Sequence, residues 1–160
     1  MTPIELLQNL KIVTEKSLSE MRLEVKGEPG TQEVTRRRPT VFLGKLPAKK
    51  EKLTKYIPYV LIRILSGADE QRQGNKSTAI ASTRFIVATY SEDDSGYIDC
   101  LNIINRLRLN LLEAGIVGNK FLLKDQKIEW LMYEDDTGPY TIGEMVMEWD
   151  LPPIERKVQL

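Results

Sequence analysis

The first 26 residues carry apolar positions that recur with the period of an α-helix. Thr2, Pro3 and Glu5 form a capping box with proline in the first turn, a combination typical of a helix start. Gly27 and the Pro29–Gly30 pair are helix breakers. The pattern therefore predicts an N-terminal helix over residues 3–24. Its apolar face comprises Leu6, Leu7, Leu10, Val13, Leu18, Met21 and Val25.

The next 65 residues show strand patterns and polar breaks. Residues 27–55 lack a clear period and are predicted to be connecting chain with one short strand at 40–43. Residues 56–65 are apolar at most positions, which indicates a strand covered on both faces and starting near Pro58. A polar loop at 66–77 precedes a second strand at 79–90. These two strands are expected to form an antiparallel hairpin.

The second half of the chain predicts one helix followed by three strands. The helix spans 96–114, preceded by acids and serine and ended by Gly115. The strands span 120–124, 127–133 and 140–151, and the last alternates apolar and acidic side chains. The expected fold is α+β, with a mostly antiparallel sheet on which an N-terminal and a central helix pack, in the order α-β-β-β-α-β-β-β. It is a single domain, 1–160, made of the helix (1–26), a basic connecting arm (27–55) and an α/β core (56–155).

The central helix has more apolar surface than one sheet contact requires. One stripe, which suits packing on the sheet, comprises Cys100, Leu101, Ile104, Leu107, Leu111 and Ala114. A second stripe comprises Ile98, Leu109, Leu112 and Ile116. Either the N-terminal helix covers this second stripe or it is a subunit interface. Arg108 lies between the stripes and is either a surface arginine or half of an ion pair across an interface.

The amino-acid composition excludes most kinds of catalytic site and metal site. The chain has no histidine and one cysteine, so it lacks Ser-His-Asp and Cys-His systems, zinc sites and internal disulfides. Cys100 lies on the apolar stripe and is expected to be a buried, inert thiol. No run is long and apolar enough for a membrane span, and the N-terminus does not resemble a signal peptide. We therefore expect a soluble protein that is not an enzyme and has no cofactor.

Charge is unevenly distributed although the 23 basic and 23 acidic residues balance. Residues 36–55 hold eight basic residues and one acidic residue, including Arg36, Arg37, Arg38, Lys49 and Lys50. This segment is a plain loop, an arm that docks on an acidic neighbour, or a nucleic-acid patch with few aromatic residues for base stacking. A turn formed by Glu134, Asp135 and Asp136 is a candidate acidic neighbour, a cation site or a solvated turn.

The stretch from Pro58 to Pro153 resembles the tail terminator (tail completion) proteins of long-tailed phages and phage-tail-like particles. It covers 96 of the 160 residues and excludes residues 1–55. The residues that carry it are Pro58-Tyr59-Val60, Gly67, Ile86 to Tyr90, Asp93-Asp94, Asp99 to Arg108, Leu111-Leu112, Ile128-Glu129-Trp130, Pro139-Tyr140, Gly143 and Pro152-Pro153.

This resemblance implies a structural protein that forms a sixfold ring. Such a ring caps the tail tube, stops its growth and joins the tail to the neck or head, so the implied partners are further copies, the tube protein, the sheath and a neck or head-completion protein. It implies assembly in the bacterial cytoplasm and a place in the virion or tail-like particle. A head-completion, neck or baseplate connector is the alternative within this class, and a nucleic-acid-binding adaptor is the alternative outside it. The basic arm and the acidic turn are the expected inter-subunit contacts.

Overall fold

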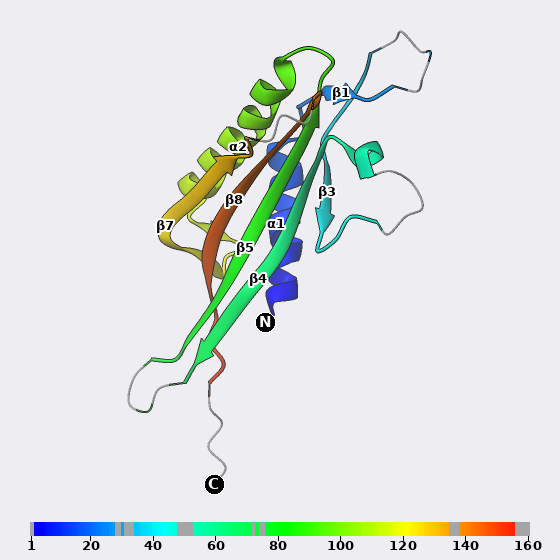
Figure 1. The fold of residues 1–160 in the computed structure, drawn as a ribbon. Helices are drawn as coiled ribbons and strands as arrows, with labels where there is room; N and C mark the ends of the chain where they lie inside the picture. Colours follow the sequence, from blue (N-terminus) through cyan, green and yellow to red (C-terminus); the bar gives the residue numbers. More distant parts are fainter. Residues whose placement is uncertain are drawn as a thin grey trace.

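The computed structural model describes residues 2–27, 30, 34–47, 53–71, 73, 76–134 and 138–155. Among them are two α-helices, α1 and α2, and eight strands, β1 to β8, together with one short 3-10 helix, η1 (Figure 1). In chain order the elements are α1 (Pro3–Ser17), β1 (Leu23–Val25), β2 (Thr35–Arg37), β3 (Thr40–Leu43), η1 (Leu53–Tyr56), β4 (Tyr59–Glu70), β5 (Thr78–Tyr90), α2 (Ser95–Ala114), β6 (Ile116–Val117), β7 (Phe121–Met132) and β8 (Tyr140–Leu151). The expected α+β class, with an N-terminal and a central helix, is confirmed.

Six of the strands form one sheet, in the order β3-β4-β5-β8-β7-β6. All neighbouring pairs are antiparallel except β3 and β4, which run parallel. β5 and β8 pair along their whole length at the centre, from Ala79 with Leu151 to Tyr90 with Tyr140. β1 and β2 form a separate two-stranded ribbon.

Both helices cover the same face of this sheet (Figure 1). The main core lies between the helices and the sheet, and Trp149, Phe85 and Phe121 are its largest fully buried side chains. A smaller cluster covers one end of the opposite face, around Tyr59 and Leu61. The strand β4 is therefore covered on both sides only from Tyr59 to Ile62, and Arg63 and most later residues are exposed.

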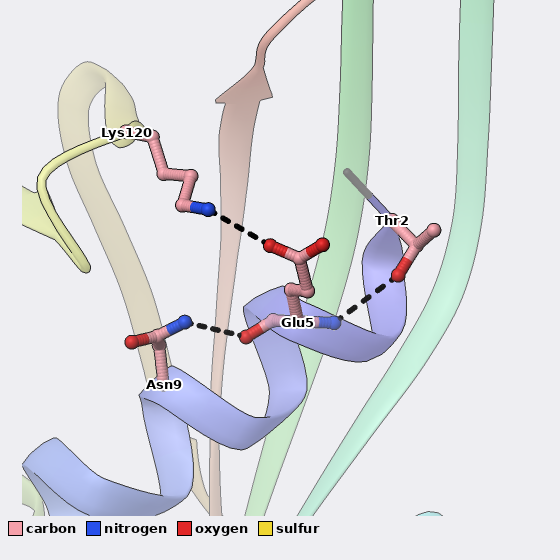
Figure 2. A network of polar contacts seen from close by, with 4 residues as sticks. All are labelled: Thr2, Glu5, Asn9 and Lys120. Carbon is pink, nitrogen blue, oxygen red and sulfur yellow. Dashed lines mark hydrogen bonds and ion pairs between the residues drawn. The ribbon is translucent and has the colours of Figure 1, made fainter.

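The helix α1 is shorter than its apolar pattern predicts. Figure 2 shows its start, where the Thr2 hydroxyl accepts a hydrogen bond from the backbone N–H of Glu5 (3.4 Å) and the Glu5 carboxylate pairs with Lys120 (2.9 Å). The helix ends at Ser17, and the prediction of helix to residue 24 is wrong. Leu18 and Leu23 are still buried, but they reach the core from a turn and from β1.

The hairpin of β4 and β5 is confirmed, with a shorter connection than predicted. β4 continues to Glu70, so residues 66–70 belong to a strand and not to the polar loop. The antiparallel ladder runs from Tyr59 with Ala88 to Glu70 with Thr78 and shifts register by one residue at Leu65. A β-bulge of this kind bends a strand without ending it.

The strand β7 replaces two of the predicted strands, 120–124 and 127–133. Asp125 and Gln126 adopt left-handed backbone angles, with φ of 56° and 51°, and the ladder with β8 is interrupted between Leu123 and Ile128. The polar residues that suggested a break thus form an irregular bulge of several residues within one strand. The short strand β6 and the β1–β2 ribbon are additional to the prediction.

Candidate assembly surface

The second apolar stripe of α2 faces solvent. Ile98 is 54% exposed, Leu109 47%, Ile116 38% and Leu112 37%. The opposite side of the helix packs on the sheet through Cys100, Ile103, Ile104, Leu107 and Leu111. Gly115, the C-cap residue with φ 67°, ends the helix as expected. Ile98, Leu109 and Leu112 lie on the helix, whereas the fourth predicted stripe residue, Ile116, belongs to β6. Together they form an exposed apolar surface that binding of another chain can bury.

The helix α1 lies beside α2 and leaves this stripe exposed. The Asn110 amide donates to the Ser17 hydroxyl (2.8 Å), which fixes the two helices next to each other. A groove remains between them, lined by Ile12, Val13, Met21 and Leu109 among polar residues. The interpretation that the N-terminal helix covers the second stripe is therefore wrong.

Arg108 makes contacts within its own chain. Its guanidinium lies over the ring of Trp130 on β7, with 5.4 Å between the guanidinium carbon and the ring centroid. Its Nη2 also donates to the side chain of Asn105 (3.2 Å). Trp130 is 43% exposed, so the pair extends the apolar surface of α2 to the edge of the sheet.

The three consecutive arginines have different surroundings. The Arg37 guanidinium donates to the Tyr56 carbonyl (2.8 Å) and to the Thr40 hydroxyl (2.5 Å), so it holds β2 against the end of η1. Arg36 lies near the acidic start of α2. The pKa of Asp93 there is lowered mainly by hydrogen bonds from Ser91 and Ser95, and the charge of Arg36 adds a smaller effect. Arg38 is exposed beside α1, near Lys11 and Glu15. Lys49 and Lys50 lie outside the described residues.

The acidic residues gather in a hollow at the start of α2. Asp93, Asp94 and Tyr97 line it together with Glu134 and the turn before β8. Asp135 and Asp136 lie outside the described residues. No group of three or more histidine, cysteine or acidic side chains within the described part of the chain is arranged to hold a metal ion.

Two hydrogen bonds hold the Asp93 side chain in its charged form. The Ser91 hydroxyl (2.6 Å) and the Ser95 backbone N–H (2.8 Å) both donate to its carboxylate. Bonds from Ser91 and then Ser95 lower the pKa of Asp93 to about 2. The capping residue itself, Asp94, makes no capping hydrogen bond with its side chain.

Cys100 is buried against the sheet. Burial raises the pKa of its thiol to about 12. A thiol with such a pKa carries almost no thiolate at neutral pH, and the thiolate is the nucleophile. The expectation of an inert thiol agrees with this position.

Sequence reasoning missed the exposed side chains of β7. The exposed fraction is between 41% and 50% for Leu122, Trp130 and Leu131 on β7 and for Tyr133 directly after the strand. The run from Ile128 to Tyr133 is apolar at five of six positions, which is typical of a buried strand. Its position next to the sheet edge, which the run itself does not encode, leaves these side chains in solvent.

In comparisons with known proteins, no family model matches the chain, and no curated protein matches it either. Neither helix of the described structure has the length and apolar character needed to cross a bilayer. The surfaces of the chain therefore carry the functional argument.

Proposed function

We propose that this protein is a structural assembly protein of the tail terminator class. In this proposal copies of the chain form a sixfold ring that caps the tail tube, stops tube growth and joins the tail to the neck or head. The proposed partners are further copies of the chain, the tube protein, a neck or head-completion protein and, in a contractile tail, the sheath. Its proposed location is the tail end near the neck of a virion or phage-tail-like particle assembled in the bacterial cytoplasm.

The exposed apolar stripe of α2 is the observation that carries this proposal. Ile98, Leu109 and Leu112 are rigidly placed on a 20-residue helix, yet no described part of the chain covers them. A monomeric protein has little reason to hold such a face in solvent. The neutral total charge is compatible with close packing of many copies, because no net repulsion separates them.

The size of the stripe favours assembly on a template. Burial of four such side chains contributes about 6–12 kcal/mol in gross terms. Association of two proteins costs about 4–15 kcal/mol in lost freedom and ordering. The two amounts are comparable, so the stripe alone supports only weak association in solution. A tube end that holds several copies together provides the additional contacts.

A deletion experiment tests this function. The gene is removed from the producing bacterium, particles are induced, and tail lengths are measured in electron micrographs. Overlong or ragged tubes without heads are expected, because nothing stops tube growth. Restoring the parent gene should restore normal tail length. A matched copy that encodes Ile98→Glu with Leu109→Glu should fail to do so.

Other outcomes of the same experiment contradict the proposal. Tails of normal length beside heads that fail to join would place the protein among head-completion or neck connectors. Wholly normal particles would reject a role in the tail.

A further inference from the structure

The sheet has two strand edges that no described strand completes. β3 pairs with β4 only at Tyr59 to Ile62, so the outer edge of β4 from Arg63 to Asp69 has no described strand beside it. β6 pairs with β7 only at Phe121 and Leu122, and the backbone N–H of Leu123 bonds to Gly115. From Ile128 to Met132 the outer edge of β7 has no described strand beside it either. Exposed strand edges present rows of backbone donors and acceptors for another strand.

The two edges run in opposite directions. β4, β5, β8 and β7 follow one another in the sheet, and each pair is antiparallel. Two copies placed side by side in the same orientation therefore bring β4 of one copy antiparallel to β7 of the next. Such a contact is heterologous, the type that closes into rings.

The backbone groups on both edges belong to residues that face the helix layer. On β4 the N–H of Gly44 bonds to the carbonyl of Ile62, so the backbone N–H and C=O of Ile62 point away from β5. Because the bulge at Leu65 shifts the alternation by one residue, the backbone groups of Gly67 and Asp69 also point away from β5. On β7 the N–H of Tyr133 bonds inward to Ile142, which leaves Ile128 and Trp130 pointing outward. Pairing these edges keeps the helices of both copies on one side of a continuous sheet.

We propose that β4 of one copy pairs with β7 of the next copy, with Gly67 opposite Trp130. In this register Ala68 lies opposite Glu129, and Asp69 lies opposite Ile128. Trp130 is a large ring at the edge of β7, 43% exposed, whereas Gly67 has no side chain. An aromatic side chain across from an edge glycine covers its bare backbone, which stabilises such a pair.

A second copy of this chain is the favoured occupant because it satisfies both edges at once. In a closed ring each copy supplies one β4 edge and one β7 edge, so none remains open. Pairing of β4 with itself would close at a dimer and leave both β7 edges exposed. The helix layers also come together at this contact, which places Leu112 and Trp130 of one copy beside the α1 of its neighbour.

This inference rests on the proposed ring, but paired cysteines test it separately. Ala68 and Glu129 would form a pair without direct backbone hydrogen bonds, where Cα atoms are about 4.5 Å apart. That spacing suits a disulfide. Within one chain β5 and β8 separate β4 from β7 by three strand spacings of about 4.8 Å each, so the two residues cannot bond internally. Cys100 is buried and does not interfere.

The experiment compares oxidised full-length variants on non-reducing gels at high protein concentration. Ala68→Cys with Glu129→Cys is expected to give disulfide-linked multimers in a ladder, since oxidation traps even weakly associated copies. The matched control is Ala68→Cys with Glu148→Cys, because Glu148 is exposed on the same face of the sheet but lies on the central strand β8. The control is expected to lack the ladder.

Three results would overturn the edge pairing. One is no ladder beyond that of the control, and another is a dimer from Ala68→Cys alone, which reports β4 paired with itself. The third is that the oxidised Ala68→Cys with Glu129→Cys variant sediments as a ring while no disulfide joins its copies. This last result rejects the edge pairing and keeps the ring. Failure of the proposed ring function is seen in the other experiment, as normal tail length after gene deletion.

Discussion

At the scale of single residues, the core contains polar groups that satisfy one another. The Thr83 hydroxyl donates to the Met147 carbonyl (3.1 Å) and accepts from the indole N–H of Trp149 (3.1 Å). Thr83 and Trp149 are both fully buried, so no water replaces either partner. The alternating pattern of β8 predicts a buried Trp149, but it does not reveal the threonine on β5 that completes the hydrogen bond.

Replacement of this hydroxyl tests the pair. Thr83→Val keeps the shape of the side chain and leaves the indole N–H of Trp149 without an acceptor. We expect the free energy of unfolding to fall by about 1–3 kcal/mol, the usual cost of an unsatisfied buried donor. Urea denaturation measures it. Ser82→Ala, next to it on the other face of β5, is the control, and an equal loss in both variants would contradict the assignment.

Asp93 predicts a pH dependence at the start of α2. Its pKa is about 2 in the folded protein and 3.8 in its ordinary state, because Ser91 and Ser95 donate to the charged form. A lowered folded-state pKa stabilises the fold above pH 4, and this stability is lost as the pH falls from about 4 to about 2. Asp93→Asn should therefore melt below the parent at pH 6, and the gap should close near pH 2.

The melting temperature as a function of pH measures this effect. Asp94→Asn is the charge-matched control, because the Asp94 side chain makes no capping hydrogen bond. A gap between Asp93→Asn and the parent that stays constant from pH 6 to pH 2 would show that the charge of Asp93 is not what stabilises the helix start.

At the scale of elements, the sequence predicts the bounds of a helix or strand where the apolar period and the residues that end the element agree. α2 lies between a serine and Gly115, and β8 alternates without interruption, so both are found within one residue of prediction. The predicted N-terminal helix is too long because Leu18, Met21 and Val25 continue the helical spacing of apolar residues, although their backbone is not helical. The β1–β2 ribbon was missed because three-residue strands have too few positions for a period to be seen.

The assembly surface could be predicted only in part. The second stripe of α2 follows from helical spacing, and its exposure depends on where α1 packs, which no local pattern encodes. The sequence predicts one basic arm from Arg36, Arg37 and Arg38 because the three are adjacent. The structure separates them, since Arg37 is held by Tyr56 and Thr40, whereas Arg38 is exposed. Reversing all three charges would therefore disturb the fold, and Arg38→Glu alone is the cleaner test of a docking arm.

A side chain of β1 ties the β1–β2 ribbon to the segment that precedes α2, in addition to the buried contact of Leu23 with the core. The Glu24 carboxylate accepts a hydrogen bond from the backbone N–H of Glu92 (2.8 Å), just before the helix. Glu24→Ala should speed hydrogen exchange at Glu92 and within β1 and β2, while the global free energy of unfolding changes by less than about 1 kcal/mol. Exchange followed by NMR measures both quantities. Unchanged exchange at Glu92 would contradict this role.

At the scale of the whole molecule, the stripe of α2 and the sheet edges belong to one assembling surface. Ile98→Glu with Leu109→Glu places two charges on the stripe without touching the core. The monomer should keep a melting temperature close to the parent, since exposed substitutions change stability by about 0.5 kcal/mol or less. Oligomers should disappear, because a charge buried at an interface without a partner is costly.

Sedimentation of the parent and the variant at equal concentration measures this loss. Ile154→Glu, an exposed apolar position that follows the end of β8, is the control outside the stripe and the proposed contact. Persistence of oligomers in the stripe variant, or their equal loss in the Ile154→Glu control, would exclude the stripe as the contact.

The central position of β8 also bears on how the chain is made. β5 is synthesised 61 residues before its main partner, since Ala79 to Tyr90 pair with Tyr140 to Leu151. Until β8 leaves the ribosome, β5 exposes one whole edge and the helix α2 lacks one of the two central strands on which it packs. The sheet therefore cannot close before β8 has been synthesised. Folding waits for the last strand, and a nascent chain stalled before residue 140 presents a long unpaired strand to chaperones and to other nascent chains.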